Sequence, residues 1–306
     1  MKKLLLILIC MLPFSRVSAI DIDKTITVDG LQRYYIIHLP ANYSALKRLS
    51  IIFALHGGGG TAKNTVGQYN LNPVADKHDF IVIYPDAMNK SWSMKGISSK
   101  VKSNSQDIDD VHFISVLIDT ISAYYKGDAK NVFCTGISRG GIFSLFLASR
   151  LSNRIKAIAP VCASIPQSIA GDYAFAHPTP VLMINGTADP LINYNGGAGK
   201  FGKPSGDEDE YDMLPTEVLV KKIKVLNGCT TDPQTYNFPD VDPADGCTAV
   251  QYTYSCNNVQ VKFVKVINGG HTWPGGKQYL PKFIIGKLCM DFKAEDEIVN
   301  FFMAVK

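Results

Sequence analysis

A short stretch in the middle of the chain holds a serine between two glycines, in the pattern Gly-x-Ser-x-Gly. It runs from Gly136 to Gly140 and contains Ser138. An apolar, strand-like run from Asn131 precedes it, and an apolar, helix-like run to Leu151 follows it. In this context the pattern predicts a tight strand-to-helix turn that exposes the serine hydroxyl at the positive end of the helix. The chemistry that such a turn favours is nucleophilic attack by Ser138.

A serine nucleophile needs a base, and the base needs an orienting acid. For this kind of turn the three residues follow one another as Ser, then Asp or Glu, then His. Two histidines follow Ser138: His177 precedes an apolar run, whereas His271 follows the last such run, in "NGGHTWPGG". Glycines on both sides would let the loop place the imidazole over the serine. We therefore predict His271 as the base.

The candidate acid is Asp189, in "NGTADP", because it follows the apolar run that ends at Gly186. Its alternative role is an Asx-turn or a helix cap, since Asp before Pro is common in both. The oxyanion site is predicted at "HGGGG", where Gly57 and Gly58 let the backbone approach a substrate. The amide of Arg139 supplies the second donor.

The N-terminal segment predicts export. Two lysines precede an apolar run that ends at Leu12, and Val17-Ser18-Ala19 supplies small residues for cleavage. This is the layout of a secretory signal peptide over residues 1–19. We expect residues 20–306 to form one secreted domain, extracellular or periplasmic, with no membrane association after cleavage.

Charge excludes some partners. Removal of residues 1–19 takes away three cations and no acid, so the formal net charge falls from +4 to +1. A nearly neutral chain has no electrostatic basis for binding nucleic acid or an anionic membrane. The oligomeric state stays open.

Six cysteines remain after cleavage, and an even number in an exported chain suggests disulfides. Cys134 and Cys162 lie in apolar runs and suit buried thiols. The other four lie in the loop-rich last third of the chain: Cys229, Cys247, Cys256 and Cys289. No C-x-x-C spacing occurs, so we expect no metal site, and the predicted chemistry requires no cofactor.

Apolar runs alternate with helical patterns along most of the chain. The runs at 50–56, 80–86, 131–136, 155–162 and 180–186 are almost continuously hydrophobic, as in strands that helices cover on both faces. The run at 259–267 alternates and predicts an edge strand. Helices are expected between the runs, one of them after Asp110 as its N-cap. The pattern predicts an α/β fold with a mostly parallel central sheet and helices on both faces.

Five segments together resemble a known family: "HGGGG", "DDVHFISVLID", "GISRGG", "NGTADPLINYNGG" and "GGHTWPGG". They are similar to the secreted esterases that group polyhydroxybutyrate depolymerases with feruloyl and acetylxylan esterases. The resemblance implies an α/β-hydrolase fold, with Ser138, Asp189 and His271 as a catalytic triad. It also implies a disulfide between Cys229 and Cys256 and leaves the other cysteines unassigned.

One departure from that family is Arg139, where such proteins often carry a small or amide residue. A bulky cation there would narrow the pocket or meet an acidic group of the substrate. Trp92 and Trp273 are candidate walls of the substrate pocket, with packing inside loops as the alternative role of Trp273.

The resulting hypothesis is a secreted serine esterase that works through an acyl-enzyme. Its expected substrates are small-molecule or polysaccharide-linked esters, such as feruloyl or acetyl esters, or short polyhydroxyalkanoate oligomers. Acyl transfer and peptide hydrolysis use the same triad and stay open. The alternatives are a polyhydroxybutyrate depolymerase that acts on polymer, and a catalytically silent binding protein on the same scaffold.

Overall fold

The computed structural model describes residues 19–41, 43–44, 47–94, 108–199, 212–256 and 259–306. All but the last residue of the predicted signal peptide, 1–19, therefore lies outside the described residues. Within the described residues, no helix combines the length and the apolar character needed to cross a membrane.

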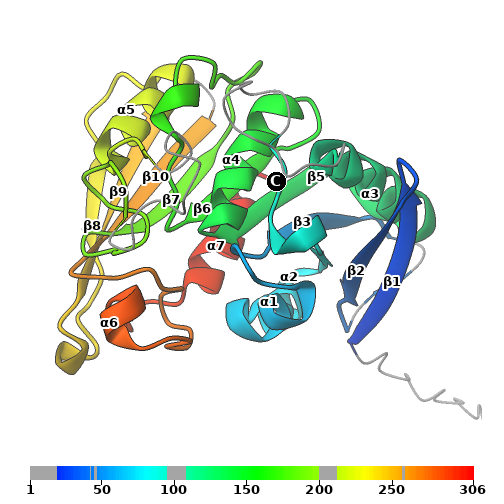
Figure 1. Cartoon of the computed structure of the whole chain (residues 1–306), viewed down its shortest axis with the longest axis horizontal. Helices are drawn as coiled ribbons and strands as arrows, with labels where there is room; N and C mark the ends of the chain where they lie inside the picture. The colour runs from blue at the N-terminus through cyan, green and yellow to red at the C-terminus, as the bar shows by residue number, and fades with distance from the viewer. Residues whose placement is uncertain (1–18, 42, 45–46, 95–107, 200–211, 257–258) are drawn as a thin grey trace, which may run out of the picture.

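One ten-stranded sheet organises the chain, in the order β1-β2-β4-β3-β5-β6-β7-β10-β9-β8 (Figure 1). The strands are β1 (Ile20–Val28), β2 (Leu31–Leu39), β3 (Leu49–Leu55), β4 (Phe80–Pro85), β5 (Gly127–Ile137), β6 (Ala157–Val161), β7 (Val181–Gly186), β8 (Gln234–Asn237), β9 (Thr248–Cys256) and β10 (Val259–Ile267). The six strands from β4 to β10 in this order are parallel, and the pairs at both ends are antiparallel. The carboxyl ends of the parallel strands therefore meet at one edge of the sheet.

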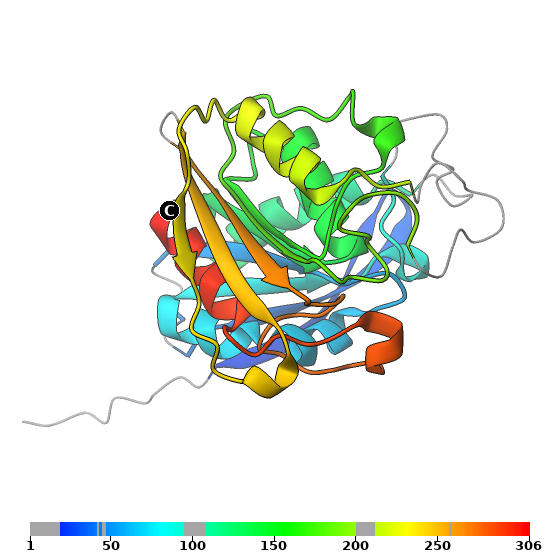
Figure 2. The same cartoon turned by 90° about the vertical axis from the view of Figure 1, so that its left-hand side faces the viewer.

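Helices cover both faces of the sheet. The helices are α1 (Ala62–Tyr69), α2 (Leu71–His78), α3 (Asp110–Tyr124), α4 (Arg139–Arg150), α5 (Thr216–Leu226), α6 (Lys282–Ile285) and α7 (Ala294–Ala304), with short 3₁₀ turns η1 (Met88–Lys90), η2 (Gln167–Ile169) and η4 (Pro243–Asp245). Figures 1 and 2 show α3, α4 and α5 on one side, and α1, α2 and α7 on the other. This is the arrangement of an α/β-hydrolase fold, as the sequence predicted.

Two hydrophobic cores follow from the alternation of side chains along the parallel strands. In β3, Ile51, Phe53 and Leu55 pack into the core under α3, α4 and α5, whereas Ile52 and Ala54 face the core above α1, α2 and α7. All five side chains are completely buried. Burial on both faces explains why these strands are continuously apolar in sequence.

The structure corrects two details of the sequence-based prediction. The run at 259–267 is not an edge strand, because β10 pairs with β7 on one side and with β9 on the other. Its alternating pattern instead reflects burial, because Val261, Phe263 and Val266 are buried whereas Lys262 and Lys265 stay partly exposed. Helix α3 is capped by Asp109, whose carboxylate accepts from the amide of His112, and not by Asp110.

The structure contains the disulfide that the family resemblance implied. It joins Cys229, after α5, to Cys256, at the end of β9. Cys134 and Cys162 are buried thiols, as expected from their apolar surroundings.

Asp110 instead belongs to a buried ion pair that ties β2 to the start of α3. Its carboxylate pairs with the guanidinium of Arg33 and accepts from the amide of Ser93 at 2.6 Å. The guanidinium also donates to the carbonyl of Asp86 and lies 3.8 Å from the ring centre of Phe113. Both charged side chains are almost completely buried.

We predict that Arg33→Met costs about 3–5 kcal/mol of unfolding free energy, because the Asp110 carboxylate is left buried without a cation. The double variant Arg33→Met/Asp110→Asn should lose clearly less, since it removes the uncompensated charge. Urea unfolding of the three proteins measures both effects. Equal losses in the single and double variants would contradict this account.

Candidate active site

Ser138 lies at the turn between β5 and α4, with φ 56° and ψ −126°. A positive φ is costly for a residue with a side chain, so the surrounding structure must hold it. Its amide donates to the carbonyl of Val161 on β6 at 2.9 Å. The turn therefore has the strained backbone that the Gly-x-Ser-x-Gly pattern predicted.

The two glycines of the pattern allow the turn to pack closely on β3. A Cβ on Gly136 would lie 2.4 Å from the carbonyl oxygen of Leu55, and one on Gly140 would lie 2.1 Å from the same oxygen. A Cβ on Gly140 would also lie 2.6 Å from the carbonyl oxygen of His56. Only glycine fits at these positions, and the contact sets Ser138 beside the loop that follows β3.

His271 and Asp189 are in direct contact. The Nδ1 atom of His271 lies 2.7 Å from Oδ2 of Asp189, and both side chains are almost completely buried. The other carboxylate oxygen, Oδ1, accepts from the amides of Leu191 and Ile192 at 2.8 and 2.9 Å. These bonds fix the carboxylate, which in turn orients the imidazole and favours a proton on Nδ1.

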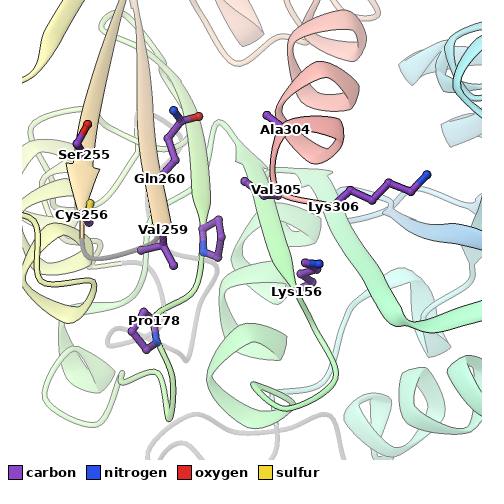
Figure 3. A pocket seen from close by; sticks show the side chains of 10 residues that line it. Lys156, Pro178, Ser255, Cys256, Val259, Gln260, Ala304, Val305 and Lys306 are labelled. Carbon is purple, nitrogen blue, oxygen red and sulfur yellow. The ribbon is translucent and has the colours of Figure 1, made fainter.

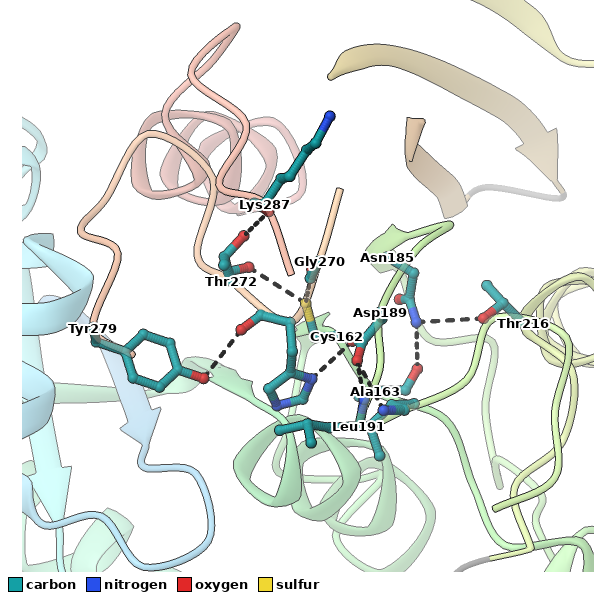
Figure 4. Close-up of polar contacts among 12 residues, drawn as sticks. Cys162, Ala163, Asn185, Asp189, Leu191, Thr216, Gly270, Thr272, Tyr279 and Lys287 are labelled. Atoms are coloured by element: carbon teal, nitrogen blue, oxygen red, sulfur yellow. Dashed lines mark hydrogen bonds and ion pairs between the residues drawn. The ribbon is translucent and has the colours of Figure 1, made fainter. Parts of the chain in front are cut away.

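Cys162 lies next to this pair, and the sequence analysis did not identify this contact. Its Sγ lies 3.3 Å from the carbonyl oxygen of Thr272 and 3.6 Å from that of Gly270 (Figure 4). Burial, together with the charge of Asp189, raises the pKa of the Cys162 thiol well above its usual range. The residue thus stays protonated and can donate its S–H to the carbonyls around His271. In the sequence, the only signal for this contact was a cysteine at the end of a predicted buried strand.

The loop after β3, residues 56–60, is shaped by its own histidine. The Nε2 atom of His56 accepts from the amide of Ala87 at 3.0 Å, so Nδ1 carries the proton and donates to the carbonyl of Gly57 at 2.8 Å. The amide of Gly60 donates to the same carbonyl at 3.0 Å. The carbonyl of Gly57 is therefore engaged within the loop.

The predicted oxyanion residues gather around Ser138. A Cβ on Gly57 would lie 3.7 Å from Cβ of Ser138, and one on Gly58 would lie 3.9 Å from Cβ of Arg139. Arg139 is the first residue of α4, where helical amides have no partner within the helix. Its guanidinium donates to the carbonyl of Trp92 at 3.3–3.4 Å, which directs its charge toward the segment after η1.

A pocket of about 300 Å³ joins these elements. Its lining residues are His56, Gly57, Gly58, Gly59, Gly60, Asn64, Thr65, Gln68, Ile137, Ser138, Leu191, His271, Tyr279 and Leu280. Ser138 and His271 thus share one cavity at the carboxyl ends of the parallel strands, where open α/β sheets bind ligands.

A larger pocket of about 600 Å³ lies at the opposite edge of the sheet, where β6, β7 and β10 begin (Figure 3). Lys156 and Lys306 contribute its charged side chains, and no Asp, Glu or His is among the described residues that line it. This pocket lacks the acid–base groups that the smaller one has.

Comparison with known proteins gives a consistent result. The family described as "Putative esterase" matches residues 30–178. "Putative esterase NocK" of Nocardia uniformis subsp. tsuyamanensis is 25% identical over 287 residues, which cover 92% of this chain and 82% of the relative. "Feruloyl esterase B" of Piromyces equi is 25% identical over 253 residues, which cover 80% of this chain but only 44% of the relative. The chain is therefore similar in sequence to these esterases.

The solved structures agree on the fold. The acetyl xylan esterase from Aspergillus awamori superposes with a TM-score of 0.55 at 15% identity, over 82% of this chain and 94% of that protein. The resemblance that the sequence motifs indicated, to the family of feruloyl and acetylxylan esterases, is confirmed. The family match ends before Asp189 and His271, so it says nothing about the roles of these two residues.

The two tryptophans expected as pocket walls lie elsewhere, and neither is among the described residues that line the pocket. Trp92 is buried against Phe143, and its Nε1 donates to the carbonyl of His56 at 2.8 Å. Trp273 is stacked on Tyr69 at 4.1 Å, and its Nε1 donates to Glu295 at 3.0 Å. Each indole is therefore held inside the protein by its packing and by its hydrogen bond.

We predict that Gly140→Ala lowers the unfolding free energy by about 3 kcal/mol or prevents folding, since the new methyl overlaps two backbone oxygens. Gly67→Ala is the matched control, because Gly67 lies inside α1 with open space around its Cα. The control should gain about 0.5–1 kcal/mol from higher helix propensity. Urea unfolding tests both variants, and wild-type stability of Gly140→Ala would refute the packing argument.

A second prediction concerns pH. Burial lowers the pKa of His56 from its ordinary value of 6.5, so the unfolded chain takes up this proton before the folded one does. Stability from His56 is therefore complete above pH 6.5 and falls as the pH drops toward the folded-state value, by up to about 1.4 kcal/mol per pH unit.

The matched variant is His56→Gln, which keeps polar atoms but does not titrate. Urea unfolding between pH 5 and 8 should show the difference in stability between wild type and variant shrinking below pH 6.5. A difference that does not change with pH would mean that His56 titrates normally in the fold.

Proposed function

We propose that the chain is a serine hydrolase of carboxylic esters in which Ser138 is the nucleophile, His271 the general base and Asp189 the orienting acid. The observation that carries the proposal is the 2.7 Å contact between His271 and Asp189 at the pocket that Ser138 also lines. Esterase is also the activity named for the relatives.

In the proposed reaction, Oγ of Ser138 attacks the ester carbonyl while Nε2 of His271 takes its proton. Asp189 accepts from Nδ1 and stabilises the imidazolium that forms. The amide of Gly57 or Gly58, together with that of Arg139, stabilises the oxyanion. His271 then protonates the leaving alcohol, and water repeats the cycle on the acyl-enzyme to release the acid.

The lining of the pocket is consistent with a small, uncharged acyl group on the substrate. Its described side chains other than Ser138 and the two histidines are neutral: Asn64, Thr65, Gln68, Ile137, Leu191, Tyr279 and Leu280. We propose feruloyl or acetyl esters of polysaccharide, or short polyhydroxyalkanoate oligomers, as the substrate class. Because the guanidinium of Arg139 is bonded to the carbonyl of Trp92, we do not assign it an acidic substrate group.

We also propose that the chain is exported as a single catalytic domain after loss of residues 1–19. The disulfide between Cys229 and Cys256 supports an oxidising compartment, since such bonds are rare in reducing cytosol.

The decisive experiment compares wild type with Ser138→Ala on p-nitrophenyl acetate and butyrate, methyl ferulate, acetylated xylan and a hydroxybutyrate trimer. We expect kcat/KM to fall by roughly 10⁴-fold or more, as when a serine nucleophile is removed. Ser152→Ala, just after α4, is the serine control and should keep full activity. The preferred ester identifies the substrate class.

Covalent labelling separates an enzyme from a silent binding protein. A fluorophosphonate should modify Ser138, detected by peptide mass spectrometry, in wild type and in Ser152→Ala but not in Ser138→Ala. Wild type that neither hydrolyses these esters nor takes the label would sink the proposed function and favour the binding protein.

A further inference from the structure

Two buried cysteines that the proposed chemistry does not use lie next to each other, close to the segment that bonds to the His271 loop. Cys247 directly precedes β9, and Cys289 lies between α6 and α7. Both are almost completely buried thiols. The two side chains share a hydrogen bond, which lowers the pKa of Cys247 and raises that of Cys289. The fold thus brings together two thiols that are 42 positions apart in sequence.

The carboxylate of Asp245 bonds to both of the backbone segments that carry these thiols. Oδ1 of Asp245 accepts from the amide of Cys247 at 2.6 Å, and Oδ2 accepts from the amide of Met290 at 2.7 Å. Since Met290 follows Cys289, a single side chain bonds to both segments. Oδ1 of Asp291 adds a bond from the amide of Val241 at 3.2 Å. The two segments are held in fixed register around the thiols.

We propose that Cys247 and Cys289 form a second disulfide in the mature protein. The bond between Cys229 and Cys256 shows that this chain already contains one cross-link, at the other end of β9. Cys134 is buried in the core under α3, α4 and α5, and Cys162 in the opposite core, so these two remain thiols.

The oxidation is a thiol–disulfide exchange with a disulfide-bearing partner, either an oxidised dithiol oxidoreductase or glutathione disulfide. One cysteine thiolate attacks the partner's disulfide and displaces one partner thiol. The second cysteine then attacks the mixed disulfide and displaces the other. The two cysteines lose two hydrogens, and the partner's disulfide is reduced to two thiols. Because both sulfurs are buried in the folded chain, the exchange occurs before the two segments pack.

The proposed disulfide would restrain the segment whose carbonyl groups accept hydrogen bonds from the His271 loop. The amide of His271 donates to the carbonyl of Ile285 at 2.5 Å, and that of Gly270 donates to Lys287 at 2.8 Å. The amide of Gly275 donates to the carbonyl of Cys289 itself at 2.9 Å. A bond from Cys289 to the start of β9 therefore restrains the base of the loop.

A metal site is the competing arrangement. One ligand atom each of Asp245, Cys289 and Asp291 lie within 4.8 Å of one another, and Oδ2 of Asp291 has no hydrogen-bond partner among the described residues. The disulfide is favoured because both oxygens of Asp245 already accept backbone amides. Metal analysis therefore belongs in the test.

The test uses the full chain, exported into an oxidising compartment and then unfolded in urea with N-ethylmaleimide and no reductant. Peptide mapping should find the label on Cys134 and Cys162, and a cross-linked peptide that contains Cys247 and Cys289. Cys134→Ser should lose one label, whereas Cys247→Ser/Cys289→Ser should lose none. Label on Cys247 and Cys289 in protein whose Cys229–Cys256 bond is intact would overturn the proposal, as would one bound zinc per chain released by the label.

A stability measurement adds an independent readout. We expect Cys247→Ser/Cys289→Ser to melt roughly 5 °C or more below wild type, as for loss of a disulfide that closes a long loop. The difference should become much smaller when both proteins are produced and kept under reductant, where only the cost of burying two hydroxyl groups remains. A difference of the same size under reductant would mean that the pair acts by packing alone.

Discussion

The close approach of α4 to the end of β3 is the constraint on which the rest of the site depends. The first turn of α4 packs on the carbonyl oxygens of Leu55 and His56 so tightly that Gly140 can carry no side chain. This contact sets Ser138 in the lining of the pocket with a strained backbone and places Gly57 beside it. A looser contact would separate the serine from the loop that is proposed to stabilise its oxyanion.

A series of buried polar contacts also holds the loop that follows β3. His56 bonds to the segment after β4, and its carbonyl accepts from Trp92. The next residue, Ser93, donates its amide to Asp110, whose charge is matched by Arg33 on β2. The glycine loop thus owes its shape to groups far outside the pocket. Such networks are stabilising only when every partner is present, so each of these contacts depends on the others.

The C-terminal side of the site has a parallel organisation. Asp189 is fixed by two amides of its own loop, and the thiol of Cys162 lies close to its carboxylate. His271 lies on a loop whose amides donate to the last residue of α6 and to the segment that follows it. That segment is bound in turn to the start of β9 through Asp245, next to the paired thiols of Cys247 and Cys289. The position of the imidazole therefore depends on contacts made by the antiparallel extension of the sheet.

The sequence by itself determined the features that are local. Continuous apolar runs predicted the buried parallel strands, and the glycines around Ser138 predicted a turn that admits no side chain, because burial and backbone sterics act on neighbouring residues. Only the tertiary structure decided where side chains that act across the fold would lie. Trp92 and Trp273 have no local signal that separates a pocket wall from a core residue, and their hydrogen-bond partners come from distant segments. The place of β10 inside the sheet was likewise settled by pairing with β9, which depends on contacts between strands and not on either strand's own pattern.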